Sequence, residues 1–165
     1  MINKTALQRR IRFLIILFIF ALSAAGLTAI PLRWELGLLN RWFGINSFLS
    51  HIFPPMSEWI RRVNHSVQNG YGGFPLLAYG TDWLAFAHII IAVLFIGPLR
   101  DPIKNIWVIE FGMIACILII PWALIFGIVR GIPWFWILID MSFGIFGMIP
   151  LWFVRRDISR ISREL

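Results

Sequence analysis

Four ionisable side chains with the potential for chemistry lie within or beside long apolar runs of the sequence: Asp82, His88, Glu110 and Asp140. An acid in the bilayer core costs roughly 2.5 to 3.5 kcal/mol on insertion scales, so it normally faces a partner or a hydrated cavity. Asp140 lies inside the run 134–154, which has about the length of a membrane-spanning helix. Gly144 and Gly147 follow it at helical spacing, so we expect another helix to approach closely on that face.

His88 and Asp140 are predicted to lie at similar depth. Each follows the start of its predicted span by six residues, or about 9 Å at the rise of an α-helix. Ala85 and Ala92 flank His88 at helical spacing and indicate a close neighbour on that face. If the two side chains pair, the carboxylate would orient the imidazole. The pair is then either a ligand-binding or proton-linked site, or a polar clasp that fixes helix packing.

Glu110 and Asp82 each have a structural and a functional interpretation. Glu110 lies near the cytoplasmic end of its predicted span, where Arg100, Lys104 or Arg155 is placed to form an ion pair with it. The alternative is an acidic entrance to the bundle. Asp82 is predicted to stand at the N-terminus of its helix, as a cap or as a favourable charge at the positive end of the dipole, with a site role as the alternative.

Aromatic and sulfur-containing residues give weaker indications. Most of the nine tryptophans lie near predicted span ends, as expected for an interfacial belt. Trp136, with Phe86, is a candidate for an aromatic pocket around a cation or a flat apolar molecule. The single cysteine, Cys116, allows neither an internal disulfide nor a cysteine-based metal site. Because haem-attachment, HExxH, GxGxxG and GxSxG motifs are absent, we predict no cofactor and no metal.

The composition predicts an integral membrane protein. Hydrophobic residues make up 59% of the chain and charged residues 14%, against roughly 45–50% and 25% in soluble domains. Mean hydropathy is +0.82. The net charge of +7 comes from basic residues that flank the apolar runs, so we attribute it to membrane topology and predict no nucleic-acid binding. This distribution places both termini in the cytoplasm, which requires an even number of spans.

The predicted fold is an all-α, four-transmembrane-helix bundle forming a single membrane domain over residues 1–165. The first apolar run continues to Ile30, which argues for a retained span over a cleaved signal peptide. A long extracytoplasmic loop follows it, and a basic, solvated cytoplasmic tail ends the chain. The predicted spans are residues 11–30, 82–99, 106–128 and 134–154, with the loop at 32–81 and the tail at 155–165.

Two short amphipathic helices are predicted in the long loop, at residues 32–43 and 56–68. In the first of them Arg33 and Arg41 are available to reach lipid headgroups. Glycine and aromatic residues between 69 and 81 predict a loop that leads into the second span.

These features predict an inner-membrane, multi-pass protein whose partner is the lipid bilayer, but they indicate no specific activity. The leading hypothesis is a non-enzymatic accessory or scaffold protein that binds a membrane-protein partner or a second copy of itself. The alternative is a membrane-embedded pocket for a lipid or small hydrophobic ligand near His88 and Asp140, which predicts a cavity beside Asp140. A further alternative is an intramembrane acid–base enzyme such as an isomerase.

Overall fold

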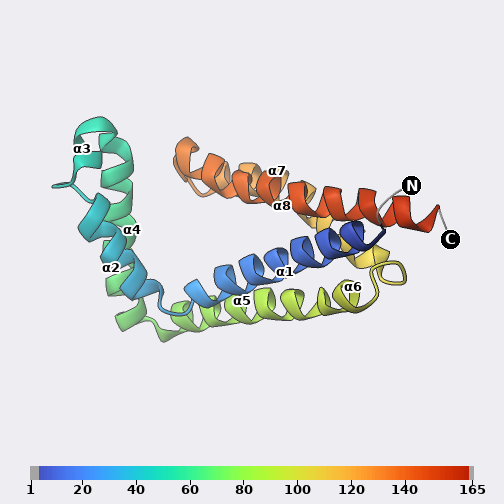
Figure 1. Ribbon diagram of the computed structural model, residues 1–165. Coiled ribbons are helices and arrows are strands. Elements are labelled where there is room, and N and C mark those ends of the chain that lie inside the picture. Colours follow the sequence, from blue (N-terminus) through green and yellow to red (C-terminus); the bar gives the residue numbers. More distant parts are fainter. Residues whose placement is uncertain (1–3, 164–165) are drawn as a thin grey trace. The chain divides into compact units, whose positions relative to one another are not determined.

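A computed structural model describes residues 4–163 of the chain, and all of its regular structure in that range is helical (Figure 1). No strand occurs among these residues. The helices in chain order are α1 (Lys4–Thr28), α2 (Leu32–Phe43), α3 (Phe48–Ile52), α4 (Pro54–Gly73), α5 (Pro75–Leu94), α6 (Ile96–Arg100), α7 (Ile106–Val129) and α8 (Trp134–Ser162).

Four of these segments are long and apolar enough to cross a membrane: α1, α5 together with α6, α7, and α8. In a bilayer a backbone must satisfy its own hydrogen bonds, which a continuous helix of about 20 apolar residues does. The prediction of a helical membrane protein with four candidate spans is therefore confirmed. Pro121 lies inside α7 and Pro150 inside α8, and both helices continue past them.

The prediction of a loop between residues 69 and 81 is wrong, because most of this segment is helical. Helix α4 continues to Gly73 and α5 begins at Pro75, so only Phe74 separates them. Proline fits the first turn of a helix because its missing N–H needs no partner there. The Tyr71 hydroxyl donates a 3.1 Å hydrogen bond to the hydroxyl of Thr81 and links the two helices. Because α5 begins at Pro75, Asp82 lies inside the helix and is not its N-cap, which corrects the sequence expectation.

The prediction of a solvated tail after residue 154 is also wrong, because the segment continues helix α8 and buries several side chains. Helix α8 runs to Ser162, and Asp157 and Ile158 are fully buried within it. Val154 and Ile161 extend the same face at helical spacing, so the apolar stripe of the span continues through the basic segment. Residues 164 and 165 of the expected tail lie outside the described residues.

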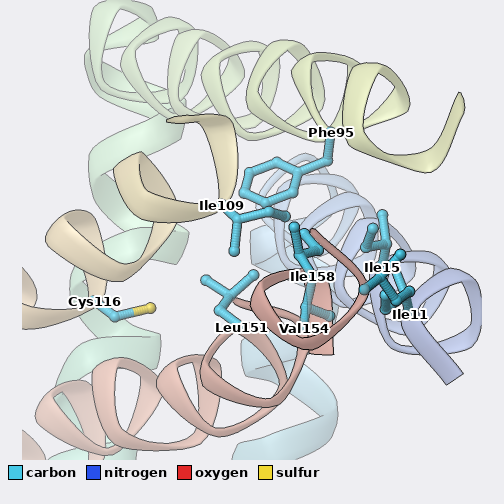
Figure 2. Close-up of a cluster of buried hydrophobic side chains, with 9 residues drawn as sticks. Ile11, Ile15, Phe95, Ile109, Cys116, Leu151, Val154 and Ile158 are labelled. Atoms are coloured by element: carbon cyan, nitrogen blue, oxygen red, sulfur yellow. The ribbon is translucent and has the colours of Figure 1, made fainter. Parts of the chain in front are cut away.

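The described chain divides into two compact units, which we treat separately. The first contains residues 4–22 and 90–163, so it holds α7, α8 and most of α1. Its core is drawn in Figure 2, where Ile109 of α7 lies among Leu151, Val154 and Ile158 of α8. The other buried members of this cluster are Ile11, Ile15, Phe95, Cys116 and Ile161.

The second unit, Ser23–Ile89, contains α2, α3, α4 and most of α5. Leu36 of α2 and Ile60 of α4 are buried in it. Close to the start of the unit, a β-carbon added to Gly26 would lie 2.8 Å from the β-carbon of His88 and 2.9 Å from the carbonyl oxygen of Ala85. The end of α1 therefore packs closely on the small-residue face of α5. The spacing of Ala85 and Ala92 around His88 predicted a close neighbour on this face.

Candidate functional site

An open groove of about 720 Å³ runs along α7 and reaches α8 in the first unit. Its lining is apolar except for one carboxylate, Asp140, and one guanidinium, Arg130. The other lining residues are Phe111, Ile114, Ala115, Leu118, Ile119, Trp122, Ala123, Phe126, Gly127 and Ile132. Those on α7 recur every three or four residues, which places them along one side of the helix.

The two helices that line the groove, α7 and α8, form a tight antiparallel pair with glycines at several of its closest contacts. A β-carbon at Gly144 would fall against the carbonyl oxygen of Cys116, and one at Gly127 would lie 2.5 Å from Cγ1 of Ile137. The turn between the helices contains Gly131 at a φ of +68°, a left-handed conformation that favours glycine. The close approach that Gly144 and Gly147 predicted is thus made with α7.

Asp140 lies at the edge of this pair and is partly exposed. Within the described part of its unit, its carboxylate has no hydrogen-bond or ion-pair partner. A carboxylate in apolar surroundings is unfavourable unless something donates to it. Asp140 is therefore available to a donor group that enters the groove.

His88 belongs to the second unit, and its imidazole Nδ1 lies 2.8 Å from the carbonyl oxygen of Leu84, one helical turn earlier. Asp140 belongs to the first unit. The pairing of His88 with Asp140 stays a prediction. Asp82 is exposed on α5. Trp136 is half-buried in the first turn of α8 and does not line the groove.

Glu110 forms the ion pair that its position predicted. The Arg155 guanidinium donates from Nε to the Glu110 carboxylate over 2.7 Å, and both side chains are about one-third exposed, at 37% and 35%. Arg155 also donates to the hydroxyl of Ser159. Lys104, another partner considered for Glu110, lies 3.7 Å from Asp101 instead. Glu110 is consequently held in a structural contact between α7 and α8.

The sequence analysis did not identify the roles of three charged side chains. Arg130, at the C-terminal end of α7, lines the groove. Arg10 of α1 binds Asp157 of α8 with both arms of its guanidinium, the Nε bond measuring 2.6 Å. Asp157 is completely buried. The spacing of Val154, Ile158 and Ile161 was the available indication that this segment folds inward.

The groove is suited to binding, and the described residues offer no metal centre. No group of three or more His, Cys, Asp or Glu side chains in residues 4–163 is placed to hold a metal ion. An acid–base reaction would need a second titrating group beside the substrate. The lining residues supply Asp140 and an arginine, which stays protonated in proteins.

Comparisons of the chain with protein-family models, with curated proteins and with solved structures find no match. The assignment of function therefore depends on the site itself.

Proposed function

We propose that this multi-pass membrane protein binds a lipid or another small hydrophobic ligand in the α7–α8 groove, with the polar end of the ligand at Asp140. One observation carries the proposal: Asp140, a carboxylate without a partner in its unit, lines an open groove whose other lining residues are apolar except for Arg130. The sequence hypothesis of a ligand pocket required a cavity beside Asp140, and the groove meets that requirement.

The lining defines the class of ligand. The apolar side runs from Phe111 to Phe126, roughly 22 Å along the helix at 1.5 Å per residue. An elongated apolar body fits this length. Asp140 accepts hydrogen bonds when ionised, so the polar end of the ligand should be a donor such as an ammonium or a hydroxyl group.

We further infer that the protein is a single membrane domain of the inner membrane with both termini in the cytoplasm and the segment 32–81 on the other side. Four candidate spans are an even number, which supports this topology. The basic residues that flank the spans support it as well.

Native mass spectrometry of the protein extracted gently from its own membrane tests the proposal. The native chain should retain a small molecule that the Asp140→Asn variant loses. A second variant, Ala123→Phe, fills the groove without changing charge and should also lose it. Leu124→Phe changes the neighbouring exposed position of α7 outside the groove and is the matched control. Retention of the molecule by both groove variants would refute this function.

The accessory function is the second candidate, because the apolar side of the groove also fits a helix of a partner protein. In this case, a second polypeptide, rather than a small molecule, should remain bound in the same measurement. Its loss from Ala123→Phe and its retention by Leu124→Phe would favour this candidate.

A further inference from the structure

A second hollow, of about 540 Å³, lies between α2 and α4 in the other unit. It is lined by Arg33, Trp34, Gly37, Leu38 and Arg41 of α2 and by Gln68 of α4. The five α2 positions share one face of the helix because they recur at helical spacing. Two guanidinium groups thus face one hollow, and no acidic side chain lines it.

One of the two arginines is fixed in place by a residue of the neighbouring helix. The Arg33 Nε donates to the amide oxygen of Gln68 over 3.2 Å, and the Gln68 amide nitrogen donates to the Arg33 carbonyl oxygen over 2.7 Å. The amide nitrogen of Gln68 is held in turn by the side chain of Asn64 at 3.2 Å. Since Nε carries only one of the five N–H donors of arginine, the terminal nitrogens can still donate to an anion.

Gly37 lines the hollow and lies between the two arginines in the sequence of α2. A β-carbon added there would lie 3.9 Å from the Gln68 amide nitrogen, which is ordinary contact. A β-carbon therefore fits at position 37 without a clash, and a longer side chain there would extend from the lining of the hollow. This gives a way to fill the site while keeping the helix.

We propose that this hollow binds the phosphate of an anionic phospholipid headgroup. Paired arginines recognise phosphate through charge-assisted hydrogen bonds. A membrane source is indicated by the indoles of α2: Trp34 is 66% exposed and Trp42 64% exposed. Exposed tryptophans on a helix with basic residues are typical of the membrane–water interface. The site is independent of the α7–α8 groove.

The test uses the full-length protein in detergent, titrated with phosphatidylglycerol or phosphatidylcholine and followed by native mass spectrometry. Phosphatidylglycerol should bind preferentially, and the double variant Arg33→Gln/Arg41→Gln should bind it about tenfold more weakly or worse. The matched control, Arg61→Gln/Arg62→Gln, removes the same charge from α4 outside the hollow. It should retain the affinity of the native chain.

Gly37→Leu fills the hollow without altering charge and should weaken phosphatidylglycerol binding as well. Gly37→Ala is the milder version, and it favours the helix, so weaker binding in it does not come from unfolding. Equal losses in the two arginine pairs would overturn the proposal in favour of diffuse attraction. Unchanged binding in the Arg33/Arg41 and Gly37 variants would also overturn it. If millimolar inorganic phosphate displaced the lipid, the hollow would be a site for free phosphate, and the proposal that it binds a lipid headgroup would be refuted.

Discussion

Replacement of Arg10 by alanine should destabilise the first unit more than replacement of its partner Asp157 by asparagine. The asymmetry follows from burial: the side chain of Asp157 is 0% exposed, whereas that of Arg10 is 46% exposed. Without Arg10, a buried carboxylate is left uncompensated. Without the Asp157 charge, the half-exposed guanidinium can be solvated where it stands.

The burial of the pair sets the magnitudes. Removal of one partner from a buried ion pair costs about 3 to 5 kcal/mol, and we expect about 3 kcal/mol for Arg10→Ala because water reaches the arginine side. For Asp157→Asn we expect about 1 kcal/mol, near the net value of a typical hydrogen bond. The double variant should recover about 2 kcal/mol relative to Arg10→Ala, since it removes the stranded charge.

Cys116 provides the assay, because it is the single cysteine of the chain and only 5% exposed. A maleimide should label it only when the packing of α7 against α8 opens. The labelled fraction, followed as sodium dodecyl sulfate is added to mixed micelles, gives the unfolding free energy of each variant. Arg12→Ala, an exposed arginine on the same helix, is the control and should change stability by less than about 0.5 kcal/mol. A loss for Asp157→Asn equal to or larger than that for Arg10→Ala would refute the reasoning.

Two further predictions concern helix contacts. Gly144→Ala should destabilise the protein by about 1 to 3 kcal/mol in thermal unfolding followed by circular dichroism, because the new methyl group meets the carbonyl oxygen of Cys116. Gly80→Ala, whose methyl group would meet nothing within 4 Å, should be neutral or stabilising, and a similar loss in both would contradict this account. The hydrogen bond from Arg61 lowers the pKa of Glu58 from 4.5. The stabilising contribution of this hydrogen bond to α4 is therefore present above pH 4.5 and lost as pH falls through the lowered pKa of Glu58. The protection of α4 amides, measured relative to the intrinsic exchange rate at each pH, should decrease in that range. Glu58→Gln should remove this pH dependence, and an unchanged profile in that variant would count against the assignment.

The sequence by itself determined the class of protein and the four candidate spans. A segment that crosses a bilayer needs about 20 apolar residues in a structure that satisfies its own backbone hydrogen bonds. Such segments can be recognised from the composition and the length of the apolar runs alone. Local spacing also determined the close-packing faces, since Gly144 on α8 and Ala85 on α5 both lie in tight contacts. Depth within a span likewise predicted an ion pair for Glu110 with one of three basic residues, and the structure shows it with Arg155.

Only the tertiary structure decided where several helices end and which charges meet. Glycine composition predicted a loop where α4 and α5 continue, and basic composition predicted a solvated tail where α8 continues to Ser162. Helical periodicity shows which face a residue occupies but not what packs against it. Arg10 and Asp157 are 147 residues apart in the chain, so only the packing of α1 on α8 could bring them together. The open groove beside Asp140 likewise depends on tertiary packing, because its form is set by how α7 and α8 lie against each other. The glycines permit the two helices to approach closely, but they do not determine the shape of the groove.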